Sequence, residues 1–403
     1  MKYVILIGDG MGDYPCLDLG GRTPLAAAPT PNLDFMAQNG LLGLARTVPP
    51  SMTPGSDVAI MSLMGYQPQG LLTGRGPLEA AAKKLDFSPM ELIFRLNFVT
   101  LKFSPGRVSL CNHAAGNIST TEAEELLDAL RKKLPLGPGY YLYPGVGYRH
   151  LLLWPDPAPD QAPSYPPHDY RDQDIGGLLS DPAAREIMNL VRASWPILEH
   201  HPVNKKRRAR NLPSANSIWL WGQGKRVEVK TYLERWGLTG AAISAVDLIR
   251  GLGVITGLET PVIPGATGWL DTNYQGKVEA TLEALSRLDL AVLHFEGPDE
   301  ASHQGELASK LQAIADFDAK IVGPLLRALP DFGSFRILAA CDHFTPLKIK
   351  THVADPVPFL IYGQPTLPGS PSGRAYTEAN AAATGLLVEP GAALSGLFFG
   401  PEK

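Results

Sequence analysis

The stretch YVILIGDGMGD, residues 3–13, decides the fold of this chain. It begins with the apolar run Tyr3–Ile7 and passes directly into a glycine-rich turn that carries Asp9. A short apolar run that ends in a tight turn is typical of a buried parallel strand. Because ligands of open α/β sheets bind beyond the carboxyl ends of such strands, Asp9 is a candidate site residue. Taken alone, an aspartate at this place more often caps the following turn.

Two other apolar runs end in the same way. Leu290–Phe295 (LAVLHF) is followed by EGPDEASH, and Phe335–Ala340 (FRILAA) is followed by CDHF. Helical patterns are expected at Thr121–Lys133, Lys277–Arg287 and Glu306–Leu329. Strands that alternate with helices and end in polar loops predict an α/β fold with a doubly wound sheet covered on both faces.

The length of 403 residues exceeds what one hydrophobic core usually absorbs, so two domains or one large insertion are expected. The segment from residue 86 to residue 213 lacks the strand-then-acidic-turn rhythm and contains the basic run Lys205–Arg210. We expect residues 86–213 to form an inserted α+β domain. Residues 1–85 and 214–403 then form a discontinuous domain around it.

Composition narrows the classes of partner. The net charge of -4 and the pI near 6.2 give no basic footprint, which argues against nucleic acid or an acidic membrane surface as the main partner. The three cysteines, Cys16, Cys111 and Cys341, are widely spaced and include no CxxC pair, which fits a reducing cytoplasm. The apolar run at the N-terminus is too short for a signal peptide core or a membrane span. A small-molecule substrate is therefore expected.

Metal-ligand residue types follow the second and third strands. Asp299 and His303 are four residues apart, so on a helix they face the same side and grip one ion. Asp342 and His343 are adjacent, and His352 follows nine residues later. Each group alone is more often a surface pair or a capped turn. Three strand ends that carry such groups in one chain predict a site for Mn²⁺, Zn²⁺ or Co²⁺, held by carboxylates and imidazoles.

A candidate nucleophile lies in SMTPGSDVAIMSLMG. Ser56 follows a Pro-Gly turn and precedes the helical pattern Val58–Met64. At a helix N-terminus, its hydroxyl has free N–H groups and the positive end of the dipole nearby, which favours an alkoxide and an incoming phosphate. The alternative is that Ser56 or Asp57 is an ordinary N-cap. A pure binding protein would need no nucleophile, so Ser56 favours an enzyme.

Taken together, these motifs resemble one family. IGDGMGD, PTPNLDFMA, TPGSDVAIMSLMGY, TGRGPLEA, PDEASHQG and CDHFTP, followed by His352, occur in order over nearly the whole chain. They are similar to the archaeal type of cofactor-independent (2,3-bisphosphoglycerate-independent) phosphoglycerate mutase of the alkaline phosphatase superfamily. The resemblance implies an alkaline-phosphatase-like catalytic domain at 1–85 and 214–403 with an inserted substrate-binding lid at 86–213.

The resemblance also implies the chemistry. Two divalent metal ions are expected, with Mn²⁺ first and Zn²⁺, Co²⁺ or Mg²⁺ as alternatives. One ion would be held by Asp9, Ser56, Asp342 and His343, and the other by Asp299, His303 and His352. Ser56 would take the phosphate from 3-phosphoglycerate and return it to the other hydroxyl to give 2-phosphoglycerate. Water must stay out meanwhile, which gives the lid its function.

Five residues are expected to bind the small phosphorylated hydroxy acid. By resemblance, Lys277 would lie at the phosphate, and Asn204 and Arg207 would form an Asn-x-x-Arg element of the lid. Arg149 is a candidate for the carboxylate because its planar fork suits bidentate recognition. His113 is a candidate acid or base. The alternative for the basic run is a solvated face.

One departure from the family pattern keeps other substrates open. SIWLWGQGK carries Trp219, Trp221 and Gln223 where an aliphatic strand followed by an arginine is expected. A homoserine kinase or another phosphoryl transfer to a small hydroxy acid is therefore an alternative, as is a metal-dependent phosphatase of the superfamily. Some relatives carry the label phosphonopyruvate decarboxylase. The sequence does not predict the oligomeric state.

Overall fold

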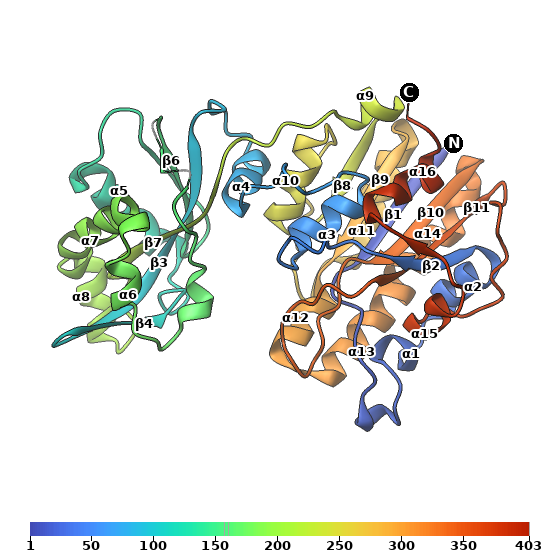
Figure 1. Cartoon of the computed structure of the whole chain (residues 1–403), viewed down its shortest axis with the longest axis horizontal. Coiled ribbons are helices and arrows are strands. Elements are labelled where there is room, and N and C mark those ends of the chain that lie inside the picture. The colour runs from blue at the N-terminus through green and yellow to red at the C-terminus, as the bar shows by residue number, and fades with distance from the viewer. Residues whose placement is uncertain (157, 160, 403) are drawn as a thin grey trace. The chain divides into compact units, whose positions relative to one another are not determined.

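A computed structural model of the protein describes residues 1–156, 158–159 and 161–402. The chain divides into two compact units, each described by itself. The first unit comprises Met1–Leu71 and Glu228–Lys403, and the inserted unit comprises Leu72–Val227 (Figure 1).

The first unit is built on a sheet whose strand order is β12-β2-β11-β10-β1-β9-β8. Its strands are β1 (Lys2–Gly8), β2 (Leu41–Ala45), β8 (Gly240–Ile243), β9 (Leu290–Phe295), β10 (Phe335–Cys341), β11 (Val357–Gln364) and β12 (Leu387–Val388). Four neighbours, β10, β1, β9 and β8, run parallel, whereas β11 runs antiparallel to β10 and to β2. The α/β prediction is confirmed, and the antiparallel β11 is a strand that the sequence patterns did not indicate.

The central strand β1 shows why this sheet is stable. Val4, Ile5, Leu6 and Ile7 each have 0% of their surface exposed. Successive side chains of a strand point to opposite faces, so both faces of the sheet are covered. The apolar run at the N-terminus is therefore the buried strand that its composition predicts. β9 begins and ends at the residues predicted for it.

Helices join and cover the strands of the first unit (Figure 1). They are α1 (Pro24–Ala27), α2 (Pro31–Asn39), α3 (Ser56–Leu63), α9 (Tyr232–Trp236), α10 (Asp247–Ile255), α11 (Tyr274–Arg287), α12 (Gly297–Gln304), α13 (Leu307–Asp316), α14 (Gly323–Ala328), α15 (Glu378–Ala382) and α16 (Leu394–Phe399). The single helix predicted at Glu306–Leu329 is α13, a π-helical turn at Phe317–Val322, and α14. Pro324 has no N–H for the preceding turn, which accounts for the break in the regular pattern. Among the described residues, no helix is long and apolar enough to cross a membrane.

The inserted unit has its own sheet and core. In it, β3 (Leu92–Ser104) pairs with β4 (Arg107–Asn112), β6 (Arg149–Trp154) and β7 (Ser217–Gly224), and β5 (Tyr141–Tyr143) pairs with β6. The helices are α4 (Arg75–Ala82), α5 (Thr120–Lys133), α6 (Gly176–Leu179), α7 (Arg185–Glu199) and α8 (Pro202–Ala209). Apolar side chains of α5 and α7 pack with those of β3 and β7 in one core.

The bounds of the inserted unit differ from the predicted 86–213. α4 packs on β3 and β7, and β7 pairs with β3 over most of its length. Both segments lie outside 86–213 but belong to the inserted unit because the middle strand of its sheet holds them. The sequence pattern missed this because strand pairing over such a separation leaves no local signal.

Candidate active site

Three loops meet at one edge of the first unit's sheet. β1 lies between β9 and β10 and runs parallel to both. Asp9 directly follows β1, Asp342 directly follows β10, and α12 begins two residues after β9. The N–H of Asp9 donates to the carbonyl of Phe295 at 3.0 Å, and the N–H of Gly10 donates to Oδ1 of Asp342 at 3.0 Å. The sheet thus brings residues from distant parts of the chain to one place.

The first cluster consists of Asp9, Asp342 and His343, whose candidate ligand atoms lie within 4.8 Å of one another. Nε2 of His343 is 3.2 Å from Oδ2 of Asp342 and 3.5 Å from Oδ1 of Asp9. These two carboxylate oxygens are buried and accept no hydrogen bond from the described residues. Buried carboxylate oxygens are costly without a partner, so the donor set fits a divalent cation.

Electrostatics around the first cluster lead to the same conclusion. Burial, followed by the carboxylates of Asp342 and Asp299, raises the pKa of Asp9 well above its ordinary value. Burial lowers the pKa of His343, which favours the neutral imidazole that metals bind. A cation would balance the charge that these carboxylates concentrate here.

The second cluster consists of Asp299, His303 and His352. Nε2 of His303 is 3.2 Å from Oδ2 of Asp299, as the spacing of four residues on α12 predicts, and Nε2 of His352 is 3.5 Å from Oδ1 of Asp299. The two Nε2 atoms are 3.0 Å apart. Burial alone would raise the pKa of Asp299. Hydrogen bonds from both histidines outweigh burial and hold that pKa well below its ordinary value. This set also fits a divalent ion, whose binding would release the proton of His303.

His343 connects the two clusters. Together with Asp299 and His352 it forms another group of candidate ligands within 4.8 Å. The ring centroids of His343 and His352 are 4.1 Å apart. The clusters are therefore neighbours, as a two-metal site requires.

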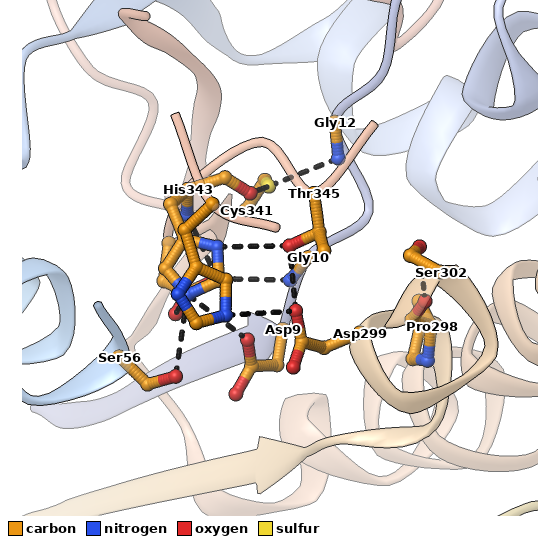
Figure 2. Close-up of polar contacts among 12 residues, drawn as sticks. Asp9, Gly10, Gly12, Ser56, Pro298, Asp299, Ser302, Cys341, His343 and Thr345 are labelled. Atoms are coloured by element: carbon orange, nitrogen blue, oxygen red, sulfur yellow. Dashed lines mark hydrogen bonds and ion pairs between the residues drawn. The ribbon is translucent and has the colours of Figure 1, made fainter. Parts of the chain in front are cut away.

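Ser56 faces the first cluster. It is the first residue of α3, and its Oγ is 3.2 Å from Nε2 of His343 (Figure 2). The N-cap of α3 is Gly55, and no side chain caps the helix. The capping alternative for Ser56 or Asp57 is therefore not what the structure has. The hydroxyl instead points toward the residues expected to hold a metal.

His294 is a site residue that sequence reasoning missed. It lies on β9 with 1% of its surface exposed, and its Nε2 is 2.8 Å from Oδ2 of Asp9. Its Nδ1 is 3.1 Å from Oγ of Ser244, which accepts the N–H of Val246 at 3.0 Å. Burial lowers the pKa of His294 to about 3, so the ring is neutral and donates Nε2–H to Asp9. The only signal in the sequence was one histidine within an apolar strand.

Lys310 is another buried residue near the site that the sequence patterns did not indicate, and Thr345, which it contacts, is a further one. Nζ of Lys310 donates to Oδ2 of Asp13 at 2.8 Å, to the carbonyl of Gly12 at 3.3 Å and to the carbonyl of Thr345 at 3.0 Å. This fully buried lysine joins the loop after β1 to the loop after β10. On the sequence it is one lysine of an amphipathic helix, and nothing there distinguishes it from a solvated one.

Lys277 lies near this edge, within the core. It has 1% of its surface exposed, donates to the carbonyl of His294 at 3.3 Å and lies 5.5 Å from the centroid of the Phe295 ring. Burial lowers its pKa to about 8. The carboxylate of Glu296 opposes this shift, so one anion already lies near the ammonium, and the phosphate contact stays a prediction.

Asn204 and Arg207 take a structural role in the inserted unit. Nδ2 of Asn204 donates to the carbonyls of Leu198 and Ala215, and its Oδ1 accepts from the N–H of Ala215. The guanidinium of Arg207 donates to Glu122 at 2.7 Å and to two backbone carbonyls. Both side chains are buried and their polar atoms are engaged, so we do not retain them as substrate-binding residues. Their motif fixes α8 in the core.

His113 and Arg149 lie in a group of arginine and histidine side chains of the inserted unit. Arg149 is exposed at the start of β6 and stacks 4.7 Å from the centroid of the Tyr148 ring. Besides burial, nearby cations lower the pKa values of His113, His168 and Arg95. We call His113, Arg149, His168 and Arg95 the basic group. The positive charge of this group lies on its two arginines, and an exposed guanidinium such as that of Arg149 suits an anion.

Trp221 is one of the three residues, with Trp219 and Gln223, that depart from the expected family pattern. It lies opposite Arg95 in the pairing of β3 with β7, and the guanidinium is 4.3 Å from the ring centroid. Arg95 also pairs with Glu79 at 2.9 Å. β7 itself contains no arginine, and Arg95 of the neighbouring strand β3 stacks on the Trp221 ring.

Comparison with known proteins identifies the family. A family model described as 2,3-bisphosphoglycerate-independent phosphoglycerate mutase matches residues 37–204. A probable enzyme of that name from Geobacter sulfurreducens is 46% identical over 97% of this chain and 98% of its own length. A solved structure from Pyrococcus horikoshii has a TM-score of 0.78 at 28% identity, over 98% of this chain and 96% of that one. The cofactor-independent phosphoglycerate mutase from Thermoplasma acidophilum has a TM-score of 0.65 at 26% identity, over 99% of both chains.

These relatives match the chain over nearly its whole length, and the resemblance that the motifs suggested is confirmed. The chain belongs to the family of 2,3-bisphosphoglycerate-independent phosphoglycerate mutases.

Proposed function

We propose that this chain interconverts 3-phosphoglycerate and 2-phosphoglycerate through a phosphoserine at Ser56. The observation that carries the proposal is the position of the Ser56 hydroxyl, 3.2 Å from Nε2 of His343 and beside a buried carboxylate cluster. A homoserine kinase or a phosphatase would use the same kind of site. The relative that is 46% identical and named as a mutase favours the mutase over both.

Two divalent metal ions, Mn²⁺ first, complete the proposed site. The family is metal-dependent, and the chain has carboxylate and imidazole groups that fit such ions. One ion would be held by Asp9, Ser56, Asp342 and His343, and the other by Asp299, His303 and His352. When bound, the ions would supply positive charge that lowers the pKa of the Ser56 hydroxyl and balances the phosphoryl oxygens.

Ser56 performs the transfer in two halves. Its Oγ forms a bond to phosphorus while the bond from phosphorus to one glycerate oxygen breaks. The glycerate stays bound, and its other hydroxyl then takes the phosphoryl group from Ser56. The N–H groups in the first turn of α3 have no helical acceptor and are suited to the phosphoryl oxygens. Lys277 is proposed to add a positive charge on the phosphate side.

The basic group of the inserted unit is proposed to bind the substrate carboxylate. Arg149 is an exposed guanidinium of this group, and Arg95 is a second one that pairs with Glu79. A mutase must hold glycerate between the two transfers, so it needs recognition groups that a simple phosphatase does not need. We retain the prediction that this unit acts as a lid against water as part of the proposal.

A reducing compartment fits the cysteine chemistry. Cys16, Cys111 and Cys341 are free thiols, and Cys341 is buried beside the site, where its sulfur accepts the N–H of Gly12 at 3.1 Å. Disulfides are uncommon in the cytoplasm, so we propose that the enzyme works there.

The test is a mutase assay with Mn²⁺ in water enriched in ¹⁸O. The expected result is formation of 2-phosphoglycerate without ¹⁸O in its phosphate, together with phosphoserine at Ser56 by mass spectrometry. Release of ¹⁸O-labelled inorganic phosphate without isomerisation would instead indicate a phosphatase. Turnover only with homoserine and ATP would indicate the kinase.

Matched variants make the assignment of the nucleophile specific. Ser56→Ala should lose isomerisation and the phosphoserine signal together, because it removes the hydroxyl that lies 3.2 Å from Nε2 of His343 and is proposed to accept the phosphate. Ser286→Ala, at an exposed serine of α11, should behave like the wild type. Full activity of Ser56→Ala would refute the phosphoserine proposal.

A further inference from the structure

The hydroxyl of Thr345 lies between the two clusters. Oγ1 of Thr345 donates to Oδ1 of Asp299 at 2.5 Å and is 3.1 Å from Nδ1 of His343 (Figure 2). Asp299 belongs to the second cluster and His343 to the first. Thr345 is fully buried, so water does not compete for its hydroxyl. One side chain thus contacts a candidate ligand of each proposed metal.

The hydrogen-bond inventory fixes the direction of both contacts. An ionised carboxylate only accepts hydrogen bonds, so the single proton of the Thr345 hydroxyl points to Asp299. The Thr345 oxygen must then accept from His343, which places a proton on Nδ1 of that ring. The lone pair of His343 is consequently on Nε2, the atom that lies 3.2 Å from Oγ of Ser56. The hydroxyl therefore selects the metal-binding tautomer of His343 while it orients Asp299.

The backbone of Thr345 is itself held in place. Its N–H donates to the carbonyl of Gly12 at 3.2 Å, and its carbonyl accepts from Nζ of Lys310 at 3.0 Å. Lys310 also pairs with Asp13 at 2.8 Å. The hydroxyl is thus presented from a fixed position, which lets it hold its two partners in one arrangement.

We propose that Thr345 is a positioning residue that couples the two metal clusters. Without its hydroxyl, neither the tautomer of His343 nor the orientation of the Asp299 carboxylate is fixed. Metal binding should therefore weaken at both sites, not at one. The inference rests on the two-metal proposal above. A purely structural threonine would instead fill space, and a side chain of the same shape would replace it without effect on metals.

The experiment is a titration of metal-stripped protein with Mn²⁺, followed by calorimetry. The wild type should take up two ions. Thr345→Val keeps the shape and removes the hydroxyl, and it should weaken both binding events by about 10–100-fold, the usual effect of losing an outer-shell partner. Thr345→Ser keeps the hydroxyl and should bind within a few-fold of the wild type. Thr256→Val is the matched control, since Thr256 is also buried and its hydroxyl donates only to backbone carbonyls.

A second readout does not require metal. The ¹⁵N shifts of histidine side chains distinguish the two tautomers, and loss of a signal in His343→Gln assigns it. Metal-stripped wild type should show His343 protonated at Nδ1, and Thr345→Val should show a mixture. Protonation at Nε2 in the wild type would overturn the inference even if Thr345→Val does not fold.

The outcomes separate this inference from the proposed function. Wild type that binds two ions, with Thr345→Val binding equally well or weakened at one site alone, overturns the coupling and leaves the two-metal site intact. Equal losses in Thr345→Ser and Thr345→Val indicate packing and also overturn it. Wild type that binds fewer than two ions overturns the two-metal proposal together with the coupling.

Discussion

The strand-end edge of the first unit gathers acidic and imidazole groups, whereas the basic group of the inserted unit gathers arginine and histidine side chains. The acidic groups are buried, with Asp9 at 1% and Asp342 at 0% exposure, while Arg149 is exposed. Some buried carboxylate oxygens at the edge accept no hydrogen bond from described residues. In the basic group, Arg95 is mostly buried and pairs with Glu79, whereas Arg149 keeps its charge close to solvent, where the cost is lower.

This difference separates chemistry from recognition. Buried carboxylates without donors are poorly placed unless a cation joins them, so the edge suits bond-breaking chemistry. Exposed arginine stacked on an aromatic ring suits an anion that arrives and leaves. Changes at the edge should therefore lower kcat, and changes in the basic group should raise KM.

The largest effect is expected from Asp342→Asn. The substitution keeps the shape but removes one negative charge from the first cluster, so the proposed metal would bind weakly. A bound ion contributes several kcal/mol to the transition state, so kcat should fall by about 10³-fold or more. Steady-state mutase assays and Mn²⁺ stoichiometry measure the effect. Asp289→Asn, at a half-buried aspartate outside both clusters that accepts hydrogen bonds from Thr239, is the control and should retain activity. Full turnover of Asp342→Asn would remove Asp342 from the site.

The next effect concerns stability at the same edge. Lys310→Met removes one partner of a buried ion pair and leaves the Asp13 carboxylate without its cation. Such a loss costs about 3–5 kcal/mol in the free energy of unfolding, which urea denaturation measures. Lys320→Met is the matched control, because that lysine is half exposed in its pair with Asp316 and should cost less than about 1 kcal/mol. Equal losses in the two variants would mean that Lys310 does not join the loops.

The sequence indicated the residues of this edge because each of their motifs is contained within a few consecutive residues. A buried strand followed by Asp9, and another followed by Asp342 and His343, are patterns within a few residues. Parallel pairing then brings these ends together without further information. The helical spacing of Asp299 and His303 likewise needed only the periodicity of a helix, and α12 supplies it.

The remaining features depend on contacts between distant segments. His294 reaches Asp9 from another strand, and Lys310 reaches two loops from a helix. The motif at Asn204 and Arg207 predicts substrate binding, whereas in the structure both side chains donate to backbone carbonyls within the inserted unit. A charged side chain in a sequence does not reveal whether its partner is a ligand or a neighbouring backbone.

The basic group supplies the third prediction. Arg149→Ala removes a charged donor from the proposed carboxylate contact, and hydrogen bonds to charged groups contribute about 1.5–3 kcal/mol. KM for 3-phosphoglycerate should therefore rise by about 10–100-fold, with kcat changed much less. Arg185→Ala, at an exposed arginine that begins α7 in the same unit, is the control. A fall in kcat with unchanged KM would contradict the division between chemistry and recognition.

The smallest expected effect is a dependence of KM on pH. It tests whether Lys277, in the first unit, also takes part in binding the substrate. Burial lowers the pKa of Lys277 to about 8, so its ammonium loses the proton as pH rises through that value. If Lys277 binds the substrate phosphate, KM should rise by about tenfold between about pH 7 and pH 9, following the charged fraction. Lys277→Met should show a higher KM without this inflection.

The same loss of a proton from Lys277 increases the stability of the fold, although it weakens the proposed phosphate contact. The pKa of Lys277, about 8 in the folded protein, is below the ordinary lysine value of 10.5, so the unfolded chain binds more protons between these values. The contribution of Lys277 to stability therefore increases as pH rises from about 8 toward 10.5. The difference in melting temperature between wild type and Lys277→Met should change in that direction over the window. A constant difference, together with a KM that does not respond to pH, would place Lys277 in the core and outside recognition.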